Sequence, residues 1–170
     1  MATYQLPPLV AVAAGIVGSS WMSGAIASLS VIGVPTAQQV AKSSVLVWHG
    51  LFSNGMALMP KCAVATALSY SYAAYGLRGQ ESAKACLLSA GLVVAIIPFT
   101  LVFMSSTNAS LLGAVKGTAS LSAGEVSGLI RKWGYLNLAR SLLPLVGGVV
   151  ALSSLMKHGG ILARDGGLAM

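Results

Sequence analysis

The stretch RKWGYLNLAR, residues 131–140, places basic and aromatic residues directly before an apolar segment that ends near Met156. Read as a helix, it puts Trp133, Asn137 and Arg140 on one face, because residues three and four positions apart are neighbours on a helix. The segment that follows is long enough to cross a membrane, so we expect Arg140 to lie at or below the lipid interface. An ionisable side chain at that depth is costly unless it faces protein or water, and it therefore marks a candidate site.

The same stretch has a second interpretation as a membrane anchor. Arg and Lys side chains extend toward the lipid headgroups, and Trp and Tyr prefer the headgroup level. This interpretation suits Arg131, Lys132 and Trp133. It suits Asn137 and Arg140 less well, because they lie further into the apolar segment.

The composition indicates a membrane protein. Of the 170 residues, 56% are hydrophobic and 8% are charged, and a soluble domain of this size would expose large apolar patches. The ten basic residues give a formal charge of +7, but they are scattered along the chain. A nucleic-acid-binding segment has a Lys/Arg-rich run instead. We therefore expect the chain to contact a lipid bilayer and to have no nucleic-acid partner.

Four apolar segments predict an all-α integral membrane four-helix bundle, formed as a single membrane domain by residues 1–170. A helix needs about 20 apolar residues to cross a hydrocarbon core of about 30 Å. Residues 36–54 are expected to form a loop with an additional interfacial or re-entrant helical segment, VLVWHGLF at 45–52, between the first and second spans. The four predicted spans cover approximately residues 9–32, 59–77, 85–104 and 134–156.

Proline residues set the expected ends and bends of these spans. The Gly-Val-Pro sequence at 33–35 is expected to end the first span, and Pro60 to open the second at a first helical position. Pro98 and Pro144 predict kinks within the third and fourth spans. Residues 105–112 are polar and are expected to leave the membrane, and the Gly-rich tail from His158 is expected to be loose.

Small residues repeat every four positions along the first span, at Gly15, Ser19, Ser23 and Ala27. This spacing allows another helix to approach closely. The partner helix can belong to the same bundle or to another protomer, so the pattern is compatible with a homo-oligomer.

Four short motifs together resemble the DUF1772 family, and within it the fungal anthrone oxygenase-like branch. The resemblance extends from the first span to Met156. It implies a membrane enzyme that converts an anthrone-type polyketide to an anthraquinone with O2 and needs no cofactor. For a fungal protein it further implies the endoplasmic reticulum or another endomembrane. The motifs are Gly-x-Pro at 33–35, Met-Pro at 59–60, Thr-Asn-x-x-Leu-Leu at 107–112 and Arg-x-Trp-x-x-x-Asn-x-x-Arg at 131–140.

The residue types permit this chemistry. The chain has two His and three acidic residues, and it lacks a Gly-rich dinucleotide fingerprint and a His-plus-carboxylate set for non-haem iron. Cys62 and Cys86 have no second Cys or His at ligand spacing, so we expect no metal site. A disulfide between them needs the two helices to place them side by side, and we expect free thiols, since thiols in a membrane usually serve as small apolar side chains. Without a cofactor, the substrate itself must supply the electrons.

The resemblance implies a role for each candidate residue. Arg140 is the expected partner of the substrate oxyanion, with the amides of Asn137 and Asn108 as neutral donors. His49 is the expected general base, and Glu125 comes second because its spacing from Ser122 already predicts a capping box. The expected catalytic residues are His49, Asn137, Arg140 and Glu125, and the expected substrate-binding residues are Trp48, Asn108, Trp133 and Tyr135.

Two alternatives have different consequences. A cyclase or isomerase in the same scaffold would need the pocket but not oxygen. A structural membrane protein would have no reaction, and replacing Asn137 or Arg140 would then lower only its yield and stability. A channel is a weaker interpretation, because the predicted spans contain almost no charged residues.

Overall fold

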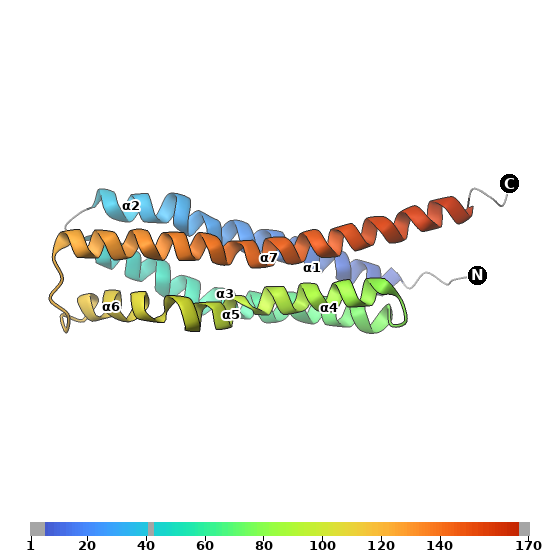
Figure 1. Ribbon diagram of the computed structural model, residues 1–170, viewed down its shortest axis with the longest axis horizontal. Coiled ribbons are helices and arrows are strands. Elements are labelled where there is room, and N and C mark those ends of the chain that lie inside the picture. The colour runs from blue at the N-terminus through green and yellow to red at the C-terminus, as the bar shows by residue number, and fades with distance from the viewer. Residues whose placement is uncertain (1–5, 41–42, 167–170) are drawn as a thin grey trace.

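The computed structural model describes residues 6–40 and 43–166, with side chains through residue 157 (Figure 1). Every regular element in these ranges is helical, which confirms the predicted all-α class. In chain order the elements are α1 (Leu6–Ser28), the π-helical segment η1 (Leu29–Gly33), α2 (Val34–Gln39), α3 (Ser44–Gly76), α4 (Glu81–Val94), α5 (Ile96–Phe99), the π-helical segment η3 (Thr100–Met104), α6 (Ser105–Val115) and α7 (Ala123–Gly166).

These elements form four long rods that lie side by side (Figure 1). The first rod is α1-η1-α2, the second is α3, the third runs from α4 to α6, and the fourth is α7. The α1 helix packs on α3 and α7, and α4 packs on the same two helices. The beginning of α1 and the end of α7 lie at one end of the bundle, as four antiparallel crossings require.

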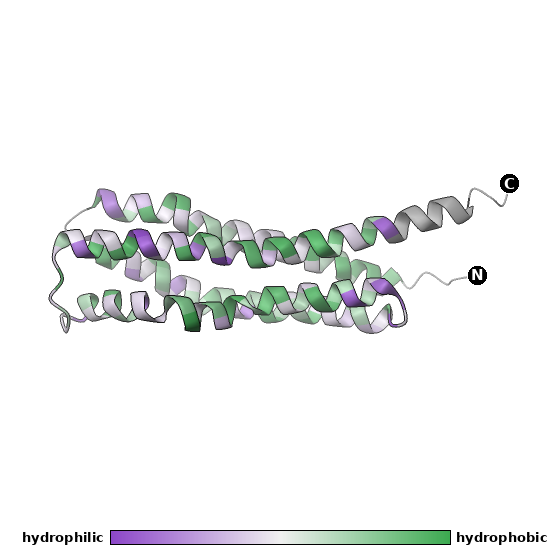
Figure 2. Cartoon of the chain, viewed as in Figure 1, coloured by the Kyte–Doolittle hydropathy of each residue, from purple (hydrophilic) through white to green (hydrophobic). Residues whose placement is uncertain are grey.

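Three of the rods are long and apolar enough to cross a membrane, namely Leu6–Gln39, Glu81–Val115 and Ala123–Lys157. This finding confirms that the chain is a membrane protein. The α3 helix contains the predicted span 59–77 but carries polar residues such as Asn54 and Lys61 along its length, so its own crossing stays a prediction. Figure 2 shows strong hydrophobic colouring on η3, on α4 after its first turns and on the middle of α7, and more hydrophilic residues toward α2 and the start of α7.

The rods are longer than the predicted spans. A rod of 35 residues measures about 52 Å at ~1.5 Å per residue, which exceeds the ~30 Å of a hydrocarbon core. Helix continues beyond the predicted span ends at 33–35, at Met104 and near Met156, to Gln39, to Val115 and to Gly166, respectively. The span ends themselves stay predictions. The predicted loose tail thus begins within α7, and its last residues, 167–170, lie outside the described residues.

The predicted loop at 36–54 is wrong, because most of these residues are helical, in α2 and in the first part of α3. The α3 helix begins at Ser44, so the expected interfacial segment is its first part and Pro60 lies inside the helix rather than at its start. A proline removes one backbone hydrogen bond and costs about 3 kcal/mol or more. Burial of Trp48, which is fully enclosed and meets Trp133 of α7 edge-on, favours keeping this first part helical and docked.

The third rod is interrupted where Pro98 predicts a kink. The α4 helix ends at Val94, α5 begins at Ile96, and the π-helical segment η3 follows at Thr100. Pro98 has no N–H to donate to the carbonyl four residues earlier, at Val94, which explains a break at this place. The α7 helix continues through Pro144, and a kink there stays a prediction.

The small residues of α1 pack within the bundle. Gly15, Ser19 and Ser23 are buried, and the Ser19 hydroxyl lies 2.9 Å from the Tyr70 hydroxyl of α3. A Cβ atom at Gly15 would lie 2.5 Å from the Tyr70 ring. Close approach of α3 therefore accounts for this part of the pattern, and a homo-oligomer stays a prediction.

This packing predicts that Gly15→Ala destabilises the protein, because the new methyl group displaces the Tyr70 ring. Overpacking of this kind costs about 1–3 kcal/mol, and thermal unfolding in detergent measures it. Gly24→Ala on the same helix is the matched control, since a Cβ atom there meets nothing within 4 Å. Equal melting temperatures for the two variants would contradict the packing.

Candidate active site

A polar layer lies between two apolar clusters in the bundle interior. One cluster contains Met59, Ile96 and Ala151 and extends toward the end where α1 begins. The other contains Trp48, Met104 and Trp133 and lies toward α2 and α6. Thr100, Asn137 and Arg140 fall between them along η3 and α7, and all three are buried.

Arg140 is held in this layer by neutral partners. Its Nη1 donates to Thr100 Oγ1 at 2.6 Å, and its Nη2 donates to Asn137 Oδ1 at 2.5 Å. Asn137 Nδ2 donates in turn to the Ile26 carbonyl at 3.4 Å, and Thr100 Oγ1 donates to the Ile96 carbonyl at 2.7 Å. The guanidinium is therefore fixed between α1, η3 and α7 although its side chain is only 8% exposed.

No carboxylate balances this charge among the described side chains. The ion pair found there joins Lys84 to Glu81 at 2.8 Å, on the exposed start of α4. A buried cation without a counter-ion is costly, and neutral hydrogen-bond partners offset only part of the lost hydration. The arrangement favours an anion as the missing partner.

Four buried polar atoms in the described residues have no hydrogen-bond partner: Trp48 Nε1, Asn108 Oδ1, Trp133 Nε1 and Arg140 Nε. Buried polar atoms in proteins are nearly always paired, so each exception needs an explanation. All four belong to residues that the sequence selects as candidates. Their common location indicates a site for a polar ligand or water.

Three of these residues line one cavity. Asn108, Trp133 and Arg140 line a small cavity of about 10 Å³ together with Leu29, Leu51, Phe52, Gly55, Met56, Thr100 and Met104. A neighbouring cavity of about 60 Å³ shares Gly55, Met56, Thr100 and Arg140 with it. Its other walls are apolar, formed by Met59, Pro60, Ile96, Ile97 and Leu101. Both cavities are much smaller than the about 300–1,000 Å³ of typical ligand pockets, so a small, mostly apolar molecule can bind at Arg140 only when the walls move apart.

The walls of these cavities contain the irregular parts of three rods. Leu29 belongs to η1, and Thr100 and Met104 belong to η3. In α3, Pro60 leaves the carbonyl of Met56 without its usual backbone donor. Helical segments with π-type hydrogen bonding occur often at functional sites. Their convergence on one cavity supports its assignment as the candidate site.

The predicted aromatic residues separate into two groups. Trp133 lines the cavity, and Trp48 stands behind it, stacked on the cavity residue Phe52 with ring centroids 5.1 Å apart. Trp48 also meets Trp133 edge-on at 6.1 Å. Tyr135 is 68% exposed on the outside of α7, so the structure does not bring it to the others.

His49 and Glu125 also lie outside the cavity walls. His49 is half-buried on α3, with its Nε2 3.3 Å from the Ser53 hydroxyl. Glu125 is exposed, and its carboxylate accepts a hydrogen bond from the Ser122 backbone N–H at 2.8 Å while its own N–H donates to Ser122 Oγ at 3.3 Å. The predicted capping box is thereby confirmed. At ~1.5 Å per residue, Glu125 lies about 22 Å along α7 from Arg140.

Several residues of the site were not predicted. Thr100 is the main one, because its hydroxyl links Arg140 to the backbone of the third rod. The available signal was a polar residue inside an apolar span, two positions after Pro98. No sequence feature marked Gly55 and Met56 as site residues, since they fall between the predicted loop at 36–54 and the predicted span at 59–77.

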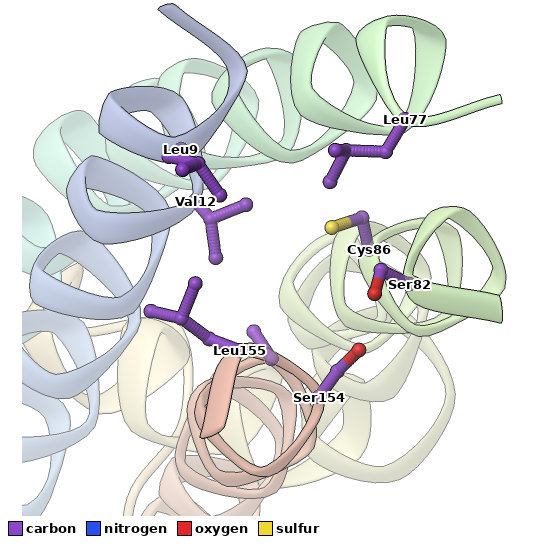
Figure 3. A pocket seen from close by; sticks show the side chains of 8 residues that line it. Leu9, Val12, Leu77, Ser82, Cys86, Ser154 and Leu155 are labelled. Carbon is purple, nitrogen blue, oxygen red and sulfur yellow. The ribbon is translucent and has the colours of Figure 1, made fainter. Parts of the chain in front are cut away.

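A further small cavity, of about 10 Å³, lies near the opposite end of the bundle. Figure 3 shows its walls, with Leu9, Val12, Leu77 and Leu155 around the thiol of Cys86 and the hydroxyls of Ser82 and Ser154. None of the four unpaired buried atoms belongs to it. Cys62 and Cys86 are free thiols, as predicted, and the described side chains contain no group of three His, Cys, Asp or Glu that could hold a metal ion.

Comparison with known proteins links this chain to one family. A family model described as anthrone oxygenase matches residues 48–150. A protein named monooxygenase hypC from Dothistroma septosporum is 39% identical over 150 residues, covering 84% of this chain and 80% of that protein. No solved structure matches the chain.

Two further relatives carry the name anthrone oxygenase. The first, tpcL from Aspergillus fumigatus, is 31% identical over 154 residues, covering 88% of this chain and 96% of that protein. The second, AgnL2 from Paecilomyces divaricatus, is 33% identical over 148 residues, covering 81% of this chain and 90% of that protein.

The hydrogen bonds of Arg140 predict that Thr100→Val destabilises the fold, because Arg140 Nη1 then loses its acceptor. Leaving a buried charged donor unpaired costs about 1–3 kcal/mol, measured by unfolding in detergent. Thr36→Val is the control, since Thr36 bonds only to the Ile32 carbonyl of its own rod at an exposed position. A loss as small for Thr100→Val as for Thr36→Val would show that Thr100 does not hold Arg140.

Proposed function

The chain belongs to the anthrone oxygenase family, and from this premise we propose that it is an enzyme that oxidises an anthrone-type polyketide to an anthraquinone with O2. One observation supports placing this reaction at the cavity that Arg140 lines. Arg140 is a buried cation that lines a cavity, is held by Thr100 and Asn137, and keeps its Nε–H free. Such a group suits a substrate that becomes an anion in an apolar pocket.

The reaction needs only the substrate and oxygen. An anthrone loses a proton from the ring CH2 opposite its ketone and becomes an electron-rich enolate. One electron passes to O2, and the two radicals combine to a peroxide at that carbon. Loss of water then forms the second ketone, so one oxygen atom enters the quinone and the other leaves as water. The oxidised carbon supplies all the electrons.

Arg140 stabilises the negative charge that develops on the substrate oxygen. A fixed cation in a site without water acts more strongly than it would in solution. Its free Nε–H and the free Nε1–H of Trp133 are the donors that point to this role. Thr100 and Asn137 act through Arg140, as positioning residues that hold the guanidinium.

The proton has two candidate acceptors. The walls of the two cavities contain no His, Asp or Glu, so one candidate is water or hydroxide that enters with the substrate. The other is His49, which follows Trp48 on α3 and is half-buried. Glu125 takes no part in this proposal, because its carboxylate caps the start of α7.

The membrane supplies the route to the site. The apolar cavity that reaches Arg140 has Met56 and Leu101 among its walls, and these side chains are 46% and 66% exposed on the outside of the bundle. An apolar polyketide dissolved in the bilayer can enter between α3 and the third rod. The relatives are fungal proteins, and we place this chain in the endoplasmic reticulum or another endomembrane, which microscopy of a tagged chain tests.

Oxygen uptake by the detergent-purified protein with a hydroxylated anthrone tests the function. The protein should raise uptake well above the spontaneous rate, with and without a chelator. Arg140→Met should lower kcat by about 100- to 1,000-fold, the usual effect of losing one oxyanion donor. Lys132→Met, at an exposed position on the same helix, is the control and should keep the activity.

The other variants and outcomes separate the alternatives. Loss of activity in His49→Ala together with a changed pH profile would assign the proton to His49, and unchanged activity would assign it to solvent. Activity abolished by the chelator would contradict a cofactor-independent mechanism. Substrate consumption without oxygen uptake would indicate a non-oxidative enzyme, and no reaction from folded protein would sink the proposal.

A further inference from the structure

We infer that Asn108 determines specificity by accepting a hydrogen bond from a hydroxyl group on the substrate ring; this inference rests on the proposed function. Asn108 lies on α6 and lines the same cavity as Arg140 and Trp133. Its side chain is 8% exposed, and its Oδ1 is fully buried without a partner. A buried amide oxygen that receives no hydrogen bond is unfavourable by about 1–3 kcal/mol.

The hydrogen-bonding role of Asn108 Oδ1 differs from that of the other unpaired atoms. Trp48 Nε1, Trp133 Nε1 and Arg140 Nε are all donors, whereas Asn108 Oδ1 is an acceptor. An enolate oxygen in the cavity can accept from Trp133 Nε1 and Arg140 Nε, which belong to cavity residues, but it offers nothing to Oδ1. A ligand that satisfies both needs an anionic oxygen and, elsewhere on the ring system, an O–H group.

No wall of the cavity donates a hydrogen bond to Oδ1 in the structure. The other walls near α6 are the apolar side chains of Leu51, Phe52 and Met104. The Thr100 hydroxyl also lines the cavity, but its hydrogen is already directed to the Ile96 carbonyl. The two unpaired donors of the cavity, Trp133 Nε1–H and Arg140 Nε–H, form no hydrogen bond with Oδ1 either. A ligand hydroxyl can therefore supply the donor that Oδ1 lacks.

A bound hydroxyl would also orient the substrate. Arg140 and Asn108 belong to different rods, α7 and α6, so contacts from both residues to one flat molecule would fix its orientation in the cavity. A site that hydrogen-bonds a substrate hydroxyl rejects the analogue without it more strongly than an apolar pocket does, because the protein atom is then left unpaired.

A matched pair of substrates tests this role: 2-hydroxyanthrone, whose hydroxyl is remote from the ketone oxygen, and unsubstituted anthrone, each corrected for spontaneous oxidation. The variant Asn108→Leu keeps the size of the side chain and removes the acceptor. We expect it to lower kcat/KM about 10- to 100-fold for the hydroxylated substrate and less than about 3-fold for anthrone. Comparing each variant with wild type on each substrate cancels the different acidities of the two molecules.

Asn54→Leu is the control variant, because Asn54 is an exposed residue of α3 outside both cavities; it should lower neither value. An equal loss on both substrates for Asn108→Leu would overturn the inference and leave the proposed function intact. Failure of the folded wild-type protein to oxidise either substrate would instead overturn the proposed function.

A second measurement covers the case in which Asn108→Leu does not fold. The wild-type protein should bind 2-hydroxyanthraquinone about 10-fold or more tightly than unsubstituted anthraquinone, measured by quenching of tryptophan fluorescence. Equal dissociation constants for the two quinones would also overturn the inference, without the use of any variant.

Discussion

The burial of one positive charge governs the middle of this bundle. Arg140 is enclosed by four rods, and in the described side chains it has hydroxyl and amide partners rather than a carboxylate. Removing a guanidinium from water costs several kcal/mol, which neutral hydrogen bonds offset only partly. Thr100 and Asn137 are each tied to a backbone carbonyl, so the charge is held in place, and the Nε–H of Arg140 stays buried without a partner beside the cavities that this residue lines. An anionic substrate, as proposed, would supply the missing partner.

The helical irregularities gather around the buried charge of Arg140. Regular helices would close the layer between the two apolar clusters, whereas η1, η3 and Pro60 leave room and free backbone or side-chain polar atoms around it. Elsewhere the bundle is tight, since Gly15 and Gly147 allow Tyr70 and the backbone of Ser89 to approach closely. The bundle is thus closely packed toward one end, and its polar layer with the two small cavities lies near the middle.

Much of the architecture was predictable from local pattern. The apolar segments, the shared face of Trp133, Asn137 and Arg140, and the Ser122–Glu125 capping box depend on spacing within one helix, which the sequence shows. The helix ends were not predictable, because Pro60 and the Gly-Val-Pro sequence resemble breaks, and only tertiary packing, such as that of Trp48 on Trp133, favours continuing the helix. For the same reason the predicted site did not include Thr100 and Met56. These residues lie on other rods, and only the tertiary fold brings them to the cavity that Arg140 lines.

The central proposal is that Arg140 binds the substrate as an anion. The measurement to make is the ultraviolet–visible spectrum of 1,8-dihydroxyanthrone bound to the protein without oxygen, at a pH at which the free compound is the neutral ketone. The account predicts that the wild-type protein shifts the bound compound to the enolate spectrum and that folded Arg140→Met does not. A bound compound that keeps the neutral ketone spectrum in the wild-type protein would contradict it.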